Sequence, residues 1–406
     1  MTVIEFFDKE SAVENIVSTL LCKPEKVVFL GNNSKRMKRS IEKYKAVAQS
    51  RGVFSEFEIR TVPSNNLMAI VGAIEEIIKE NPDCVVDLTG GDDLFLVAVG
   101  IVYGENADTL KLHRFNISDN KMVDCDSDGE LYTSAPMEMT VEENVAVYGG
   151  RVIYENEKSG GTLVWNFGDG FADDVYSMWS VCKQNPAGWN KQIKLLDKLC
   201  REGHTCDGMT YEIHISDNSS EIRELEGFLK KLSSAGVINK LCIENSDISF
   251  TFKNEQIKKC LTKSGLILEL IIALSASEAE DEGVPVYNDV LTGVFIDWDG
   301  ELQPDSKAEV ENEMDVVLMK GMVPVFISCK NGTFSVEELY KLSVVARRFG
   351  GSYVRKVLVA TELEKLGSKE AYIRARAENM GIKIIDDADS ISEDALKKKI
   401  KNLWRN

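Results

Sequence analysis

The sequence predicts an α/β protein of three successive units, covering residues 1–157, 158–260 and 261–406. Three observations support this prediction. Strand and helix patterns alternate through the first part of the chain, as they do in parallel α/β sheets. Two helices and a two-stranded hairpin follow, and a second run of helices and strands fills the last third. A chain of 406 residues is also long for a single hydrophobic core.

The first unit contains short β-branched runs separated by amphipathic stretches. The run KVVFLG ends at Gly31, and the helix before Asn81-Pro82 stops where proline forbids continuation. We expect strands at 26–31, 57–62 and 84–91, and helices starting at Lys35, at 67–80 and at 92. From 111 to 153 the pattern changes to short strands, and the polar, glycine-rich segment 156–162 marks the boundary.

The middle unit has the element order of a winged helix. Helices are expected at 189–203 and 221–238, each stopped by a glycine, and the runs NKLCIE and DISFTF form a hairpin. Only Lys230, Lys231 and Lys240 give this unit positive charge. We therefore favour a structural winged-helix connector over a DNA-reading domain.

The third unit begins with a mostly apolar helix at 263–277 that carries one acid, Glu269. A strand at 293–298 and the hairpin 312–332 follow. A serine cap, first-turn acids and a glycine stop predict a helix at 335–351. Two more strands, at 356–361 and 383–388, and a basic helix from 393 complete the unit.

Composition restricts the class of protein. The net charge of −18 argues against non-specific coating of nucleic acid by the whole surface. No apolar run is long enough to span a bilayer and no signal sequence is present, so we expect a cytoplasmic protein without membrane contact. The nine cysteines form no C-x-x-C pair and are expected to be reduced, without a structural zinc site.

The hairpin places charge on strands that otherwise resemble buried core. If its loop has an even number of residues, Asp315 lies opposite Ser328 and projects to the same side as Lys330. A carboxylate that holds a hard cation, beside a lysine that stabilises charge, suits hydrolysis of a phosphodiester. A solvated edge hairpin explains the same residues, and the hairpin alone slightly favours that interpretation.

The segment from Glu269 to Ala360 resembles the restriction-endonuclease-like PD-(D/E)xK nucleases, in particular the effector half of CRISPR-ancillary nucleases that carry a CARF sensor domain. The resemblance implies that Asp315 and Glu269 bind Mg²⁺ or Mn²⁺, that Cys329 contributes its backbone carbonyl, and that Lys330 is catalytic. Ser328 stands where the family has an acid.

The missing acid has two candidate replacements. Glu338, on the helix that follows the motif lysine, is placed to supply it, as in some members of the superfamily. Glu313 is the second candidate, and we expect it next to the strand face that turns away from the site.

The N-terminal third resembles CARF domains, which are Rossmann-like homodimers that bind cyclic oligoadenylates. The family's two ligand-binding loops correspond here to FLGNNSKR and DLTGGDDL. Glycines at a helix start leave backbone N–H groups free for an anion. Ligand-binding residues are expected at Asn32, Asn33, Ser34, Thr89, Gly90, Gly91 and Asp92. Asp92 and Asp93 replace a Thr-Lys pair common in the family, and both suit the first turn of a helix.

Together these patterns predict a homodimeric, metal-dependent endonuclease that cleaves DNA or RNA and is activated by a cyclic oligoadenylate, most simply cyclic tetra-adenylate, in type III CRISPR antiviral defence. Lys320, Lys330, Arg347 and Arg348 are expected to line a local channel for the substrate. Two alternatives remain. One is a non-catalytic CARF–winged-helix regulator that binds nucleic acid, and the other is a structural or interaction protein.

Overall fold

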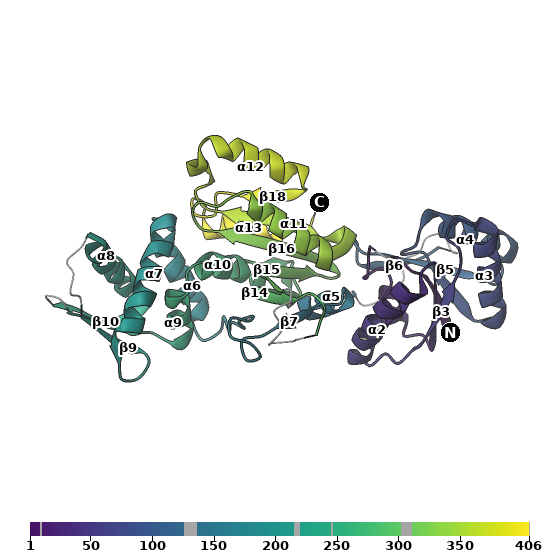
Figure 1. The fold of residues 1–406 in the computed structure, drawn as a ribbon, viewed down its shortest axis with the longest axis horizontal. Coiled ribbons are helices and arrows are strands. Elements are labelled where there is room, and N and C mark those ends of the chain that lie inside the picture. Colours follow the sequence, from purple (N-terminus) through teal and green to yellow (C-terminus); the bar gives the residue numbers. More distant parts are fainter. Residues whose placement is uncertain (9, 126–135, 215–219, 245–246, 302–310, 406) are drawn as a thin grey trace.

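The computed structural model describes residues 1–8, 10–125, 136–214, 220–244, 247–301 and 311–405. Figure 1 shows the N-terminal sheet at one end of an elongated molecule and the helices α6 to α9 at the other, with the C-terminal sheet between them. The three parts therefore do not follow their sequence order in space. No helix among the described residues is both long and apolar enough to cross a membrane.

The N-terminal unit is a doubly wound six-stranded sheet in the order β3-β2-β1-β4-β5-β6. The first five strands are parallel, and β6 is antiparallel to β5. The strands are β1 (Thr2–Phe6), β2 (Lys26–Gly31), β3 (Glu56–Thr61), β4 (Cys84–Asp87), β5 (Lys111–Asn116) and β6 (Lys121–Asp124). The helices are α1 (Val17–Cys22), α2 (Ser34–Ser50), α3 (Leu67–Glu80) and α4 (Asp93–Asn106).

Alternation along the strands divides the helices between two faces. Val27 and Phe29 pack with α1 and α2, whereas Val28 and Leu30 pack with α3 and α4. The chain changes face between β1 and β4, the point where open α/β sheets form their ligand crevice. The central strand β1 was missed by the sequence prediction, so the strand at 26–31 is the second one and not the first.

The region from 111 to 153 differs in part from the expected run of short strands. Residues Val141–Val147 form helix α5, which begins with a capping box between Thr140 and Glu143. Strand β7 (Arg151–Ile153) pairs with β14 of the C-terminal sheet. Residues on the N-terminal side of the expected boundary at 157 thus contribute to the third sheet.

The middle unit combines four helices with a small antiparallel sheet, in the order β10-β11-β9-β8. Its helices are α6 (Phe171–Cys182), α7 (Pro186–Glu202), α8 (Ser220–Ser234) and α9 (Glu255–Thr262), and its strands are β8 (His204–Thr205), β9 (Thr210–His214), β10 (Ile238–Glu244) and β11 (Asp247–Phe252). Helix α6 and strand β9 were not expected. The unit shares its core with α10 and lies beyond the C-terminal sheet, so it does not bridge the two α/β units (Figure 1).

The C-terminal sheet has the order β18-β17-β16-β15-β14-β7. Its strands are β14 (Asp289–Asp297), β15 (Glu311–Lys320), β16 (Val323–Lys330), β17 (Arg355–Ala360) and β18 (Ile382–Ile385), with a small separate pair, β12 (Glu280–Asp281) and β13 (Val284–Pro285). Helices α10 (Leu266–Ser277) and α13 (Glu393–Lys401) cover one face, and α11 (Glu337–Gly350) and α12 (Ser368–Asn379) cover the other. The 3₁₀ turns are η1 (Gly351–Tyr353) and η2 (Leu363–Leu366).

Candidate functional site

The hairpin of β15 and β16 has the register that brings its charged residues together. Lys320 pairs with Val323 across a two-residue loop, and Val316 pairs with Ile327. The next position places Asp315 against Ser328, whose hydroxyl donates to Asp315 Oδ2 at 3.1 Å. Lys330 Nζ lies 3.2 Å from the same oxygen. The expectation of an even loop is confirmed.

Asp315 accepts a third hydrogen bond, from the backbone N–H of Cys329 at 2.6 Å. Three donors on one oxygen fix the carboxylate at the end of the hairpin. Ser328 therefore acts here as a hydrogen-bond donor to Asp315. The thiol of Cys329 is buried, and burial raises its pKa well above the usual value, with Asp315 and Glu269 raising it further. A neutral thiol is a poor metal ligand, so any ligand role for Cys329 falls to its backbone carbonyl.

Lys330 lies between two carboxylates. Its Nζ is 3.2 Å from Asp315 Oδ2 and 3.2 Å from Glu338 Oε2, in the first turn of α11. Burial lowers the pKa of Lys330, but Asp315 and Glu338 outweigh burial and raise it overall. The lysine is thus held protonated, and Glu338, the expected replacement for the missing acid, is paired with Lys330 and Lys341.

Glu269 lies on α10 with an 8% exposed side chain, and its Oε2 atom has no hydrogen-bond partner among the described residues. Burial raises its pKa well above the ordinary range, and the charges of Asp315 and Glu313 add to the effect. An unpartnered, nearly buried carboxylate oxygen beside a second carboxylate is costly unless a proton or a cation compensates it.

Glu313 lies nearer to the cluster than the sequence analysis expected. It precedes Asp315 by two residues, and alternation along a strand puts such residues on one side. A methyl group built on Gly293 would lie 3.7 Å from Glu313 Oε1 and 3.9 Å from Glu269 Oε2. Gly293 falls opposite Asp315 in the register of β14 and β15 and has a positive φ of 53°. Gly293 therefore leaves space beside the carboxylates of Glu269, Glu313 and Asp315. The expectation that Glu313 lies next to the face that turns away from the site is wrong.

The donor set suits a hard cation. Carboxylate oxygens of Glu269 and Asp315 and a backbone carbonyl are the ligands that Mg²⁺ and Mn²⁺ prefer. In the present arrangement no three His, Cys, Asp or Glu side chains of the described part of the chain converge as a ready-made metal site. Asp315 instead contacts Lys330, and Glu313 pairs with Lys263 at 3.7 Å.

Residues behind Lys330 fix the end of β16 and were missed by sequence reasoning. The carbonyl of Lys330 accepts from the N–H of Thr361, and the Thr361 hydroxyl donates to the Asn331 side chain at 2.9 Å. Asn190 of α7 donates to the Asn331 carbonyl at 3.0 Å. The middle unit therefore contacts the residue next to Lys330. A buried threonine and two asparagines carry no sequence signal for such a role.

Two residues of the expected substrate channel lie elsewhere. Lys320 ends β15 at the loop, so the length of the hairpin separates it from Asp315, and its ammonium group packs over Trp404. Arg348, near the end of α11, donates to the backbone carbonyl of Tyr148 at 2.7 Å. The prediction that Lys320 and Arg348 line one channel with Lys330 is wrong, because Lys320 lies at the other end of the hairpin and the guanidinium of Arg348 contacts the Tyr148 backbone.

In the N-terminal unit, a cavity of about 540 Å³ lies at the carboxyl ends of β1 and β4. Thr89, Gly90 and Gly91 line it, as the sequence predicted. Gly91 has a φ of 105°, and a Cβ there would lie 2.6 Å from Phe6. Three charged residues that the sequence analysis did not select also line it: Asp8 and Glu14, which follow the missed strand β1, and Arg114 of β5.

The other residues expected to bind ligand are not among those that line this cavity. Asn32 donates to Ser64 at 2.9 Å, and Asn33 caps α2 by accepting from the N–H of Arg36. Ser34 begins α2, and Asp92 is the N-cap of α4. Asn32, Asn33 and Ser34 follow β2, whereas α4, β5 and the segments that follow β1 and β4 line most of the cavity.

A buried polar network supports the cavity floor. Asp87 Oδ1 accepts from the N–H of Thr89 at 2.9 Å, and Asp87 Oδ2 accepts from Ser18 at 2.5 Å. Glu5 pairs with Asp87 across β1 and β4. Burial raises the pKa of Glu5 well above its usual range, and the neighbouring charge of Asp87 raises it further. The network holds Thr89 in the cavity wall.

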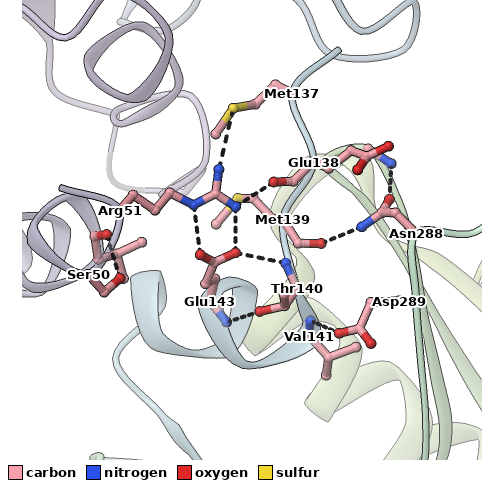
Figure 2. Close-up of polar contacts among 12 residues, drawn as sticks. Ser50, Arg51, Met137, Glu138, Met139, Thr140, Val141, Glu143, Asn288 and Asp289 are labelled. Atoms are coloured by element: carbon pink, nitrogen blue, oxygen red, sulfur yellow. Dashed lines mark hydrogen bonds and ion pairs between the residues drawn. The ribbon is translucent and has the colours of Figure 1, made fainter. Parts of the chain in front are cut away.

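Polar contacts connect this unit to the hairpin. Figure 2 shows Arg51, at the end of α2, binding both oxygens of Glu143 on α5 at 2.7 and 2.6 Å. Asn288 donates to the carbonyl of Met139 at 2.8 Å, just before α5, and accepts from the N–H of Gly321 in the hairpin loop at 2.7 Å. These bonds run from α2 through α5 to the hairpin loop. The loop lies at the other end of β15 and β16 from Asp315 and Lys330.

A second connection starts in the cavity wall. The Tyr353 hydroxyl, just after α11, donates to Glu14, and burial followed by the charge of Glu14 raises the pKa of Tyr353 to about 12. Glu338 lies at the other end of α11. One helix thus joins a residue of the cavity to a residue that holds Lys330.

No family model and no curated protein matches this sequence. Among solved structures, protein VC1899 from Vibrio cholerae aligns with a TM-score of 0.74 at 18% identity, over 100% of this chain and 98% of that one. Can2 from Sulfobacillus thermosulfidooxidans, solved in complex with cyclic tetra-adenylate (cA4), aligns with a TM-score of 0.64 at 17% identity, over 98% of this chain and 97% of that one. The chain shares its fold with both proteins over essentially its whole length.

Proposed function

We propose that this protein is a metal-dependent endonuclease that a cyclic oligoadenylate activates, with cyclic tetra-adenylate as the first candidate and type III CRISPR defence as its setting. The observation that carries the proposal is the cluster of Asp315, Ser328 and Lys330 at one hairpin end, beside the unpartnered oxygen of Glu269. The likeness in fold to Can2, solved with cA4, supports the choice of activator.

In this proposal Glu269 and Asp315 hold Mg²⁺ or Mn²⁺, with the Cys329 carbonyl as a further ligand. The ion supplies charge that polarises the phosphate and acidifies a water molecule. Lys330, kept protonated by Asp315 and Glu338, stabilises the negative charge that develops on the phosphate oxygens. Glu338 and the Asn331 contacts keep the Lys330 end of β16 in position.

The activator occupies the cavity between β1 and β4 in this proposal. Gly90 and Gly91 leave backbone amides accessible at the start of α4, and Arg114 adds a positive charge to the cavity lining. Asp8 and Glu14 suit the hydroxyl and amino groups of a nucleoside, which donate hydrogen bonds.

Metal dependence tests the catalytic half directly. The wild-type protein with cA4 should cleave plasmid, single-stranded DNA or RNA in Mg²⁺ or Mn²⁺ and lose cleavage in EDTA. Asp315→Asn should abolish cleavage and weaken the rise in melting temperature that the metal produces. Metal-dependent cleavage that survives in Asp315→Asn would assign the chemistry to another site.

A non-catalytic regulator is the second candidate, because Ser328 provides no charge where the resembled nucleases have an acid. That function predicts DNA or RNA binding without cleavage in any metal. Binding measured by mobility shift, combined with no product under the conditions above, would select it.

A further inference from the structure

The outer side of α11 and α12 carries an unusual set of exposed side chains. Among the described residues of 261–405, four large apolar or aromatic side chains are exposed, and three lie here: Tyr340 (39%), Val344 (56%) and Tyr372 (58%). Tyr340 and Val344 are four residues apart on α11, whose other side is buried against the sheet. Exposed rings gathered on one side of two helices make this side a candidate binding surface if contacts join them into one patch.

Contacts join the two helices into one surface. Arg376 of α12 donates to the Tyr340 hydroxyl at 2.8 Å, and its guanidinium lies 5.2 Å from the centre of the Tyr340 ring. Tyr372 precedes Arg376 by one turn on α12 and Lys369 precedes Tyr372 by three residues, so all three share one helix side. We call Tyr340, Val344, Lys369, Tyr372 and Arg376 the α11–α12 face.

The charge of this face favours an anionic partner. Arg376 donates to a neutral phenol here, so its full charge stays available. Of the acids on these helices, Glu370 pairs with Arg374 at 2.8 Å. Lys369 is one of the groups that lower the pKa of Glu337, after hydrogen bonds from Ser335 and from the Glu337 backbone. On a chain of net charge −18, such a local positive surface is what a polyanion needs.

The face also adjoins the proposed catalytic cluster. Glu338, which contacts Lys330 at 3.2 Å, lies in the same turn of α11 as Tyr340 but on a different side of the helix. Lys341 contacts the other oxygen of Glu338 at 3.2 Å and extends this line of polar groups toward the face. A strand of nucleic acid bound at Lys330 can therefore continue across α11 and α12.

We propose that the α11–α12 face binds a single-stranded segment of the substrate by stacking its bases on Tyr372 and on the Tyr340–Arg376 pair. Exposed aromatic rings beside an arginine are a common platform on which unpaired bases stack. Such stacking tolerates any base sequence, because every base has a flat aromatic face. Bases of an intact duplex are stacked on each other and cannot reach these rings. This inference rests on the proposed nuclease function and names the strand state of the substrate.

The test measures binding in a chain that cannot cut. Asp315→Asn, saturated with cA4, is titrated into a fluorescein-labelled 20-nucleotide oligothymidylate and into a 20-base-pair duplex, and the dissociation constants come from anisotropy. Adding Tyr372→Ala should weaken single-strand binding about tenfold, the usual loss for one stacked base. Adding Tyr372→Phe should preserve binding, because the ring remains. Duplex binding should change less than twofold.

Phe54, exposed by 78% on the N-terminal unit, provides the control. Phe54→Ala removes an equally accessible aromatic ring and should leave the dissociation constant unchanged. Unaltered single-strand binding in Tyr372→Ala, an equal loss for duplex and single strand, or no binding by Asp315→Asn would each overturn the proposal. A wild-type protein that binds through this face but never cleaves would overturn only the nuclease function.

Discussion

The ammonium group of Lys330 is the cation that unites the candidate catalytic residues. Asp315 and Glu338 both contact it, and Ser328 and the Cys329 amide hold Asp315 in place. The shared side of Asp315, Ser328 and Lys330 could be predicted from period-two alternation once the loop length is known. The place of Glu338 could be predicted from the start of α11. The Asn331, Thr361 and Asn190 contacts behind Lys330 could not be predicted, because they depend on how three separate elements pack.

Lys330→Ala should reduce activator-dependent cleavage at least a hundredfold, since one positioned charge at a reacting centre contributes about that much. Binding of cA4 should be unchanged because the cavity lies in another unit. Lys365→Ala is the matched control, as Lys365 pairs with Glu362 on the same unit at 2.5 Å. The prediction is wrong if both variants cleave at wild-type rates.

Glu5 predicts a pH-dependent stability. Its pKa is higher in the folded state than in the unfolded chain, so folding gains from the bound proton below about pH 4.5 and loses this gain as the pH rises through the folded-state pKa. Glu5→Gln keeps a donor toward Asp87 without an ionisable proton. The melting temperature of Glu5→Gln should exceed that of the wild type at pH 8 and converge with it near pH 4.

Glu25→Gln serves as the control for this titration, because its side chain is 92% exposed. It should follow the wild type across the whole pH range. A wild-type melting temperature equal to that of Glu5→Gln at pH 8 would mean that Glu5 is not a buried, protonated acid.

Elements with strong local signals were predicted well. The hairpin, α11 with its first-turn acids, and β2 and β4 all lie close to where the sequence placed them. Strand β1 was missed because its five residues stand at the very start of the chain without a preceding turn. Helix α5 was mistaken for a strand although Thr140 and Glu143 form the capping-box pattern, which shows that a cap signal should outrank a short β-branched run.

The Arg51–Glu143 pair is the clearest coupling between the elements of the two α/β units (Figure 2). The side chains are 27% and 20% exposed. Burial raises the pKa of Glu143, but Arg51 outweighs burial and lowers it overall. Arg51→Ala should keep cA4 binding and reduce the stimulation of cleavage by cA4, because α5 loses its ion pair with the end of α2 and keeps only the apolar contacts between the two helices. Calorimetry and cleavage rates measured with and without cA4 separate these effects.

Arg201→Ala is the matched control for Arg51→Ala, since Arg201 pairs with Asp197 on the exposed side of α7. Exposed pairs of this type contribute about 0–1 kcal/mol to stability. Equal stimulation by cA4 in Arg51→Ala and in the wild type would show that the Arg51–Glu143 pair does not couple cA4 binding to cleavage.

At the scale of the whole molecule, three units were predicted, and the structure adds how they share cores. One apolar cluster runs from the α2 side of the N-terminal sheet through α5 to the α11 side of the C-terminal sheet. A second joins the middle unit to α10. Sequence order suggested a linear sensor, connector and nuclease. The units are not arranged in that order in space. Strand β7, which is three residues long, pairs with β14 and so brings the chain to the third sheet before the middle unit begins.

The homodimer expected from the sequence can be tested at helix α4. Leu96, Val97 and Ile101 are exposed on it by 39%, 51% and 39%, and Leu96 also lines the cavity between β1 and β4. A second copy that covers this side would close both cavities against each other. Val97→Asp should convert the protein from dimer to monomer in light scattering and weaken cA4 binding. A monomeric wild-type protein that binds cA4 with full affinity would contradict the dimer.

The most direct test of the central claim is the initial rate of cleavage by the wild-type protein in Mn²⁺ with and without cA4. The account predicts that cA4 raises the rate at least about fivefold, since coupling between two sites of this kind is typically about 1–3 kcal/mol. Cleavage at one rate regardless of cA4 would contradict the connection from the β1–β4 cavity to Lys330.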